Sequence, residues 1–528
     1  MRPTANPLSP LRSAPAEEWQ NGWPFRRTLL VAGLVALVAT ALSFFLSSQV
    51  GMVTATVLAV IGLLIRRGPL PLLIWTAAIC LLSTACHYQL RTAPVGKMAG
   101  QRITVTGQVT DLSADPMITL TVTDRSPLPR GTRLALYCPE GSLALFDITT
   151  LEVDLKPLPA RSGTWQRQGI FLYALPTGWR HEEGHPFIEG AVPLSHAPQP
   201  LRYRLRSVLR RYLPDERGAL LSALCLGFRS DVSPWVSAVF RGSGLSHLLA
   251  VSGLHLSTLA AAVMALLRRV MGLRPAATLT ALLVLLFVWM MNFTPSVCRA
   301  GVLCLIWLGG YFCRQRPDGF NSLGLALLIL LPINPFLLWD AGFQLSFCAT
   351  AGVLVASHRM PAPPVPRRED PRHKVLCRRA AYGLRNAVGI YWGATIATLP
   401  LICAYFGGFP ITGIAANLLA ITPAATALLL GWLGLFLCAV PFLAFAGQPL
   451  LLMAAKLMDF TTRVAEICSP TWAFIPIDRP WSCLAVTGIC LLIAYAVIRR
   501  LPLRRWLPAV GFFVALTVTL GLLLTTIR

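Results

Sequence analysis

The densest group of polar side chains in this apolar sequence lies at residues 242–255, which read GSGLSHLLAVSGLH. His247 and His255 stand eight positions apart, or about two helical turns, and Ser252 lies between them. Polar groups are costly in hydrocarbon unless they are paired or hydrated. Glycine and serine alone are typical of close helix packing, whereas the two histidines favour a cavity or a path for a polar ligand.

Three further polar residues stand where later apolar segments begin. Arg299 follows a short connector in TPSVCRAG, and Asp340 and Gln344 begin the segment WDAGFQLSF. Charges at membrane depth usually find partners, so we consider an ion pair between Asp340 and Arg299. The alternative is an arginine that snorkels to the interface. Asn417 lies in a later apolar segment.

Motifs of known catalytic sites are missing from the apolar segments. The sequence contains no GxSxG nucleophile elbow and no Walker A phosphate loop, and its one match to the HExxH zinc motif, HEEGH at residues 181–185, lies outside the apolar segments. Ser252 and His255 are three positions apart, which leaves an intramembrane hydrolase open, although a nucleophile and a base on one helix are a weak signal. The 14 cysteines include no CxxC pair, and most lie in apolar runs, where cysteine packs as a small hydrophobe. We therefore expect no enzyme activity, no cofactor and no metal site.

Membrane helices must position these residues. Of the 528 residues, 55% are hydrophobic and 13% are charged, whereas soluble domains carry about 25% charged residues. The mean hydropathy is +0.62. This composition excludes a soluble enzyme, a disordered chain and a fibrous protein. It predicts a polytopic α-helical membrane protein with about 13 spans, at residues 28–46, 51–65, 70–86, 246–267, 275–293, 297–312, 320–338, 341–357, 387–406, 481–498 and 506–526, with two more crossings between 411 and 468 that Pro423 and Pro441 interrupt.

Basic residues in the connectors set the expected orientation. The net charge is +24, and 23 of the 46 Lys and Arg residues fall in alternate connectors, which places those connectors in the cytoplasm. The N-terminus is then cytoplasmic and the C-terminus extracytoplasmic, in a cell or inner membrane. The most basic connector, residues 359–385, begins with PAPPVP and is expected to be an extended, flexible loop. Six of the polar residues named above then lie in the outer half of the membrane and predict a polar mouth there, namely His247, Ser252, His255, Arg299, Asp340 and Gln344.

One segment, residues 100–195, reads as a water-soluble β domain. Apolar and polar residues alternate at 102–111, 117–123, 133–138 and 148–155, as in short strands. A small closed barrel of the OB-fold type is expected, with a sandwich as the alternative. The segment carries 8 Lys and Arg against 10 Asp and Glu, which argues against a strong electrostatic nucleic-acid site in it. The expected organisation is a tail (1–27), three leading helices (28–99), this β domain (100–195), amphipathic interfacial helices (196–245) and a membrane core (246–528).

Four blocks of the sequence resemble the ComEC family of competence membrane proteins, the channels for incoming transforming DNA. They are GLSHLLAVSGLHLS at 244–257, PSVCRAG at 295–301, NP followed by DAGFQLSF at 334–347, and ATLPLICAYFGGFPITGIAANLLAITP at 397–423. The order and spacing of these blocks fit the family pattern. The position of the β domain, between the leading spans and the membrane core, fits it as well. The resemblance covers residues 28–525.

The resemblance implies passage of single-stranded DNA through the core, with the β domain receiving it. A DNA receptor and a cytoplasmic translocation ATPase would be other chains, and a separate nuclease and a homo-oligomer are left open. The positions that match the family motifs, and so would line the DNA path, are His247, Ser252, Gly253, His255, Arg299, Asp340, Gln344 and Asn417.

The sequence departs from the family pattern in two places. No metallo-β-lactamase-like segment with HxHxDH follows the last predicted span, so we expect the chain alone not to cut DNA. Residues 161–175 lack the usual Asn-Pro-Gly and Phe-Asp of the β domain. The competing hypotheses are a permease for a smaller polar or anionic solute, and a hydrolase that uses Ser252 and His255.

Overall fold

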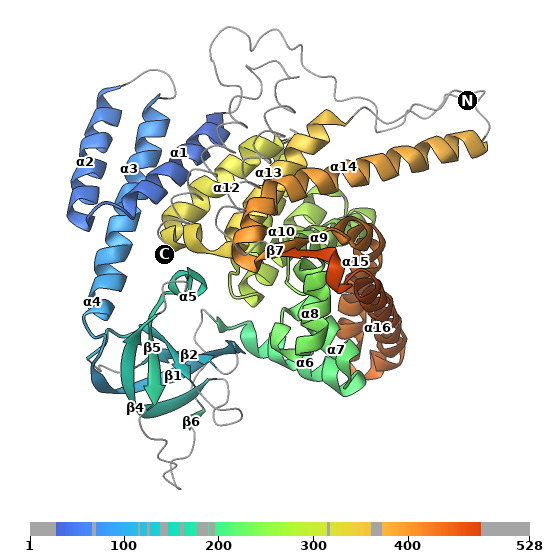
Figure 1. Cartoon of the computed structure of the whole chain (residues 1–528), viewed down its shortest axis with the longest axis horizontal. Helices are drawn as coiled ribbons and strands as arrows, with labels where there is room; N and C mark the ends of the chain where they lie inside the picture. Colours follow the sequence, from blue (N-terminus) through green and yellow to red (C-terminus); the bar gives the residue numbers. More distant parts are fainter. Residues whose placement is uncertain are drawn as a thin grey trace.

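The computed structural model describes residues 28–65, 70–114, 117–123, 127–137, 146–158, 163–176, 188–189, 196–313, 317–360 and 372–476. The predicted tail at 1–27 and the predicted spans at 481–498 and 506–526 lie outside these ranges. Figure 1 shows helices above a β barrel, with the barrel and a group of short helices at one end of the molecule.

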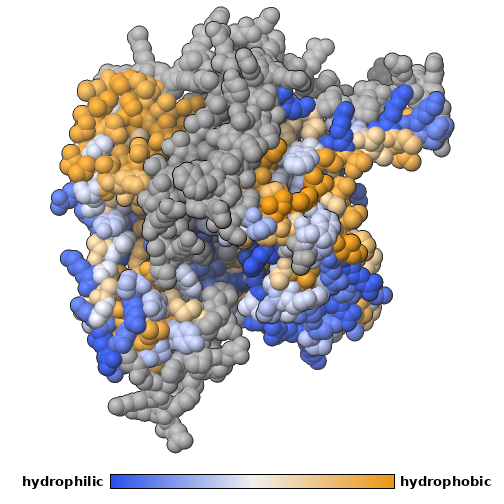
Figure 2. Space-filling view, in the orientation of Figure 1, coloured by the Kyte–Doolittle hydropathy of each residue, from blue (hydrophilic) through white to orange (hydrophobic). Residues whose placement is uncertain are grey.

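The leading apolar runs form three helices, α1 (Thr28–Ser43), α2 (Ser48–Leu64) and α3 (Leu70–His87). α1 packs against α12 (Gly319–Ile333) through two glycines, because a Cβ at Gly33 would lie 2.6 Å from the Cα of Gly324. Such backbone contact is typical of helix pairs in membranes. The leading helices are therefore part of the helical body, and Figure 2 shows their outer face as almost entirely apolar.

The strands between residues 100 and 190 form the predicted small barrel. β1 pairs with β2 on one side and β4 on the other, and β3 pairs with β5, which gives the order β1-β2-β3-β5-β4 and back to β1. Val105, Val109 and Leu120 belong to the buried cluster inside it, because side chains of a strand alternate between faces. The strands are β1 (Arg102–Ala114), β2 (Met117–Val122), β3 (Arg133–Tyr137), β4 (Asp147–Pro157), β5 (Ile170–Pro176) and the short β6 (Ile188–Glu189). A helical turn, α5 (Gly163–Arg167), precedes β5.

Seven helices of the described chain are long and apolar enough to cross a membrane. This confirms a multi-pass membrane protein, whereas the count of 13 spans stays a prediction. The helices after the barrel are α6 (Gln199–Tyr212), α7 (Glu216–Leu221), α8 (Pro234–Gly242), α9 (Gly253–Met271), α10 (Leu273–Met290), α11 (Pro295–Cys313), α12, α13 (Ala341–Arg359), α14 (Arg372–Phe406), α15 (Gly413–Cys438) and α16 (Ala444–Ile467).

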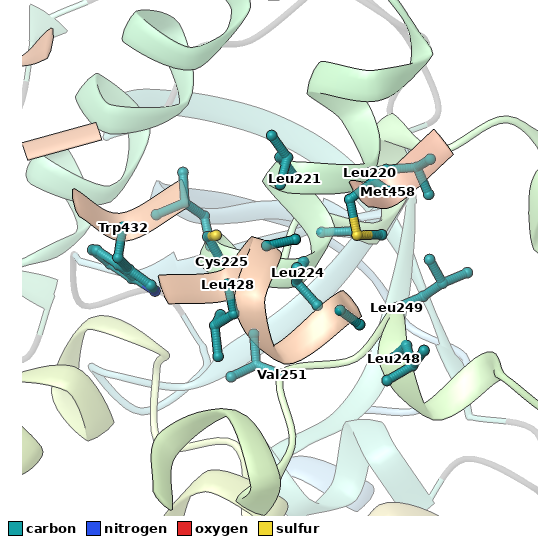
Figure 3. Close-up of a cluster of buried hydrophobic side chains, with 14 of the residues drawn as sticks. Leu220, Leu221, Leu224, Cys225, Leu248, Leu249, Val251, Leu428, Trp432 and Met458 are labelled. Carbon is teal, nitrogen blue, oxygen red and sulfur yellow. The ribbon is translucent and has the colours of Figure 1, made fainter. Parts of the chain in front are cut away.

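The short helices α6, α7 and α8 pack into the largest hydrophobic core rather than standing apart from it. Figure 3 shows Cys225 beside Leu428 and Trp432 of α15, and a Cβ at Gly431 of α15 would lie 3.7 Å from Cδ2 of Leu221. The buried face of α6 is not wholly apolar, because Leu201 is exposed and Arg202 is buried. Arg202 is accommodated because its guanidinium lies 4.2 Å from the ring centre of Phe228 and its Nε donates to the carbonyl of Leu226 at 2.7 Å.

Several predicted boundaries differ from the structure. The span predicted from 246 begins only at Gly253, because 246–248 is a 3-10 turn, η5 (Ser246–Leu248). The span predicted to end at 338 ends at Ile333, and the 3-10 turn η6 (Pro335–Trp339) follows. Pro423 does not interrupt α15.

The basic connector at 359–385 differs from its prediction more than the span boundaries do. Its Pro-rich start at 361–366 lies outside the described residues, but its second half is the first part of the 35-residue helix α14 and not a flexible loop.

Candidate functional site

The first turn of α9 holds two buried polar atoms that have no hydrogen-bond partner in the described chain, Ser252 Oγ and His255 Nε2. Ser252 is the N-cap of α9, and its backbone N–H donates to His255 Nδ1 at 3.2 Å. A neutral imidazole that accepts at Nδ1 carries its proton on Nε2. The start of α9 therefore presents one N–H donor and one hydroxyl that a ligand or water can satisfy.

Arg299 projects from α11 into the space between α9 and α13 and is only 7% exposed. Its Nε donates to Ser346 Oγ at 2.7 Å and its Nη1 donates to Thr350 Oγ1 at 2.6 Å. Ser346 and Thr350 are one turn apart on α13, so they share a face. Gly253 provides the room, because a Cβ at that position would lie 2.5 Å from Nη2 of Arg299.

The charge of Arg299 has no carboxylate partner within ion-pair distance among the described residues. Hydroxyl groups orient a guanidinium but do not neutralise it, and arginine stays protonated in proteins. An uncompensated charge in a medium of low polarity attracts anions strongly. The site is therefore suited to an anion such as phosphate or carboxylate, both of which match the guanidinium fork.

A pocket of about 450 Å³ lies beside this arginine. It is bounded by α9, α11 and α13, and of the residues that line it Arg299 alone is charged. Its other polar lining comes from Ser257 and Thr350, and Trp307 forms part of the apolar wall. The pocket therefore combines apolar walls with a single buried cation.

Asp340 pairs with a residue of the barrel and not with Arg299. Its Oδ2 lies 3.1 Å from Nε of Arg167 in α5, and both side chains are nearly buried. Asp340 is also the N-cap of α13, since its Oδ1 accepts from the backbone N–H of Phe343 at 2.8 Å. The partners of Arg299 come six and ten positions later on α13, about 9 and 15 Å along the helix. The pair considered from the sequence is therefore wrong, because Asp340 lies too far from Arg299.

Gln344 and Asn334 both contact η6, and Asn334 also contacts the barrel. Gln344 donates to the carbonyl of Leu338 at 2.7 Å and accepts from the hydroxyl of Tyr405 at 2.9 Å. Asn334 donates to the carbonyl of Arg167 at 2.8 Å. The rings of Phe171 in the barrel and Phe336 in η6 lie 5.3 Å apart. Asp340 thus docks the barrel and Gln344 braces α13, and neither residue lines the pocket.

His247 and Asn417 belong to two segments that contact each other, the turn before α9 and the first part of α15. His247 is exposed on η5, whereas Asn417 is buried in α15 and donates to the carbonyl of Gly413 at 2.7 Å. A Cβ at Gly244 would lie 2.8 Å from Cγ of Pro410 and 3.5 Å from Cα of Gly413. The blocks around residues 244–255 and 410–417 are therefore in contact, although neither His247 nor Asn417 lines the pocket.

Sequence reasoning missed Ser346, Thr350, Arg167 and Tyr405. Ser346 and Thr350 had a signal, because they are polar residues one turn apart in the otherwise apolar stretch 345–356. Arg167 and Tyr405 had none, because each meets its partner only through the tertiary fold. Among the described residues, no group of three or more His, Cys, Asp or Glu side chains is arranged to hold a metal ion.

The chain resembles known proteins over the stretch that contains this site. Residues 224–502 match the family model described as "Competence protein". The relatives include ComE operon protein 3 of Bacillus subtilis (strain 168), 28% identical over 222 residues, or 42% of this chain and 26% of the relative. Competence protein ComA of Neisseria gonorrhoeae is 26% identical over 309 residues, or 54% of this chain and 39% of the relative. Uncharacterized protein YcaI of Escherichia coli (strain K12) is 24% identical over 225 residues, or 41% of this chain and 28% of the relative.

These matches span less than half of each relative's own length. No solved structure matches the chain. The family match includes all eight residues selected from the sequence, and it also includes Ser346 and Thr350.

Proposed function

Because this chain belongs to the competence protein family, we propose that it forms the path by which single-stranded transforming DNA crosses the membrane into the cytoplasm. The observation that carries the proposal is the buried, uncompensated guanidinium of Arg299 beside a pocket between three membrane helices. DNA presents one phosphate per nucleotide, and arginine binds phosphate oxygens with two parallel N–H donors.

The hydroxyl partners of Arg299 suit transit better than tight binding. A carboxylate at the same place would compete with phosphate for the guanidinium. Ser346 and Thr350 instead hold Arg299 through two neutral acceptors, which a phosphate can supplement or replace. Conduction requires a site that is favourable enough to enter and weak enough to leave.

The unpartnered groups of Ser252 and His255 extend this site along the start of α9. Gly253 lies between them in sequence and touches Arg299. We infer that a sugar or base edge of the passing strand hydrogen-bonds to the Ser252 hydroxyl and the His255 Nε2–H. The hydrolase alternative is not retained, because the imidazole contacts the backbone N–H of Ser252 and not its hydroxyl.

Other chains complete the proposed machinery. The β barrel faces the outside and the basic connectors face the cytoplasm. A separate receptor delivers DNA, a cytoplasmic ATPase supplies the driving force, and this chain conducts the strand without cutting it. A homo-oligomer and a separate nuclease for the second strand are compatible with this arrangement.

A permease for a smaller anionic solute is the second candidate. The pocket volume of about 450 Å³ falls in the range of small-molecule sites, roughly 300–1,000 Å³. The two candidates share Arg299 and differ in what is transported.

Uptake of labelled DNA by a deletion strain tests the proposal. The strain is complemented with the unchanged chain, Arg299→Lys or Arg299→Ala, and the labelled DNA that becomes protected from external nuclease is counted. We expect both variants to reach the membrane in normal amounts and to take up no DNA, because lysine lacks the fork that binds phosphate. Arg268→Ala, on the last turn of α9, is the matched control and retains uptake. Full uptake by Arg299→Ala, or normal uptake by the deletion strain, would refute the DNA channel.

A further inference from the structure

The helix α14 is longer than a membrane requires. Its 35 residues extend for about 52 Å at 1.5 Å per residue. The hydrocarbon core is about 30 Å thick and needs about 20 residues. Roughly the first 15 residues must therefore lie outside it. In Figure 1 this part projects sideways from the other helices, at the end of the molecule away from the barrel.

The projecting part is strongly basic. Between residues 372 and 406 the sequence contains no Asp or Glu. All the Lys and Arg residues of this stretch lie in the first half, namely Arg372, Lys374, Arg378, Arg379 and Arg385. Figure 2 shows hydrophilic residues gathered at this end of the helix. The surface is therefore suited to an anionic partner.

The same part of the helix also has an apolar row. Leu376, Ala380 and Leu384 follow one another at intervals of four, so they share one face. Leu376 is 70% exposed and Leu384 is 52% exposed. Lys374 and Arg385 lie on another face, eleven positions or about three turns apart. A helix with cations on one face and leucines on another is the pattern of helices that lie in a membrane interface.

We propose that residues 373–388 lie flat on the bilayer and bind the headgroups of anionic phospholipids. Leu376 and Leu384 enter the acyl boundary, and the cations meet the phosphates. A lipid surface is favoured over a protein partner because the second half of α14 is itself a candidate span, which holds the first half at headgroup depth. Anionic lipids attract juxtamembrane cations. The inference does not depend on what the protein transports.

Lipid binding here would brace the candidate site. α14 packs along α13, the helix that supplies both hydroxyl partners of Arg299, and its Tyr405 bonds to Gln344 of α13. Anchoring the first half of α14 restrains how far the whole helix can rotate or slide.

Hydrogen exchange of the unmodified full chain in lipid nanodiscs tests the proposal. One preparation contains phosphatidylcholine alone, and the other contains phosphatidylcholine with phosphatidylglycerol. We expect amides of residues 373–388 to exchange at least roughly tenfold more slowly with the anionic lipid, because each cation near such a surface adds to the attraction. High salt should remove the difference, since it screens exposed charges.

Two variants make the test specific. The triple variant Lys374→Gln/Arg379→Gln/Arg385→Gln should exchange equally fast in both discs. The matched control Arg204→Gln/Arg211→Gln removes exposed arginines of α6 and should leave the difference intact. Equal exchange of the unchanged chain in both discs would overturn the proposal. So would protection that appears only after an acidic soluble protein is added, since the partner would then be a protein.

Discussion

The guanidinium of Arg299 is bonded to Ser346 and Thr350, and these neutral partners distinguish it from the ion-paired arginines elsewhere in the chain. Arg206 and Arg210 both contact the carboxylate of Asp231, so each has an anionic partner. Arg299 is as buried as a structural ion pair, yet no acidic residue in the described chain balances it. Its environment is therefore arranged for an anion that comes and goes.

A carboxylate placed beside Arg299 should close the site. We expect Ser346→Asp to abolish DNA uptake at normal abundance, because the new carboxylate pairs with the guanidinium. Ser346→Asn, of nearly the same size but neutral, should retain most uptake, and so should Ser357→Asp on the exposed face of α13. The measurement is DNA uptake by each variant, divided by the amount of that variant in the membrane. An equal loss of uptake by Ser346→Asp and Ser346→Asn would mean that the size of the side chain at this position matters and its charge does not.

A methyl group at Gly253 should displace the guanidinium. The added Cβ would lie 2.5 Å from Nη2 of Arg299, so the side chain must leave its bonds to α13. We expect Gly253→Ala to lower uptake by about tenfold, the effect of losing roughly 1.4 kcal/mol of binding. Gly309→Ala on α11, where a Cβ meets nothing within 4 Å, is the control. Unchanged uptake by Gly253→Ala would show that Arg299 need not stay in place.

At the scale of elements, α13 joins two parts of the protein. Its N-cap residue, Asp340, pairs with Arg167 of the barrel. Ser346 and Thr350, on its second and third turns, accept hydrogen bonds from Arg299. A rigid helix transmits displacement along its length. The position of the barrel is thus mechanically connected to the buried arginine.

The Arg167–Asp340 pair should contribute strongly to barrel docking. Asp340→Asn keeps a good N-cap but leaves Arg167 buried without a charge partner, a loss of about 3–5 kcal/mol. Arg167→Gln should cost a similar amount, and the double variant should recover part of the loss. Thermal unfolding of the purified variants gives this coupling through a double-mutant cycle. The exposed pair Arg102–Asp154 of the barrel is the control and should contribute little. Additive losses at Arg167 and Asp340 would contradict direct pairing.

At the scale of the whole molecule, the barrel and the basic half of α14 lie at opposite ends (Figure 1). The proposed orientation places the first outside and the second in the cytoplasm. Introduced cysteines test it in a chain whose native cysteines have been replaced. Arg130→Cys in an exposed barrel turn should react with an impermeant thiol reagent in intact cells, and Lys374→Cys should react only after permeabilisation. The reverse pattern would invert the topology.

The sequence by itself determined the kind of protein and the composition of its parts. Apolar runs specify membrane helices because burying backbone polar groups in lipid requires helical hydrogen bonding. Alternation specified the barrel strands, because a strand presents alternate side chains to opposite faces. The sequence also singled out Gly253, His255 and Arg299, since polar residues in apolar segments are conspicuous wherever they fold.

The tertiary structure decided which of those polar residues meet. Asp340 and Arg299 each begin an apolar segment, yet each side chain reaches only a few ångströms, so the register of α11 against α13 selects Ser346 and Thr350 as the partners of Arg299 instead. Arg167 becomes the partner of Asp340 because the barrel docks on η6. The helical state of residues 372–385 was likewise not apparent from the sequence, because the segment before them is rich in proline. Pair partners depend on distances between distant segments, and local sequence does not encode those distances.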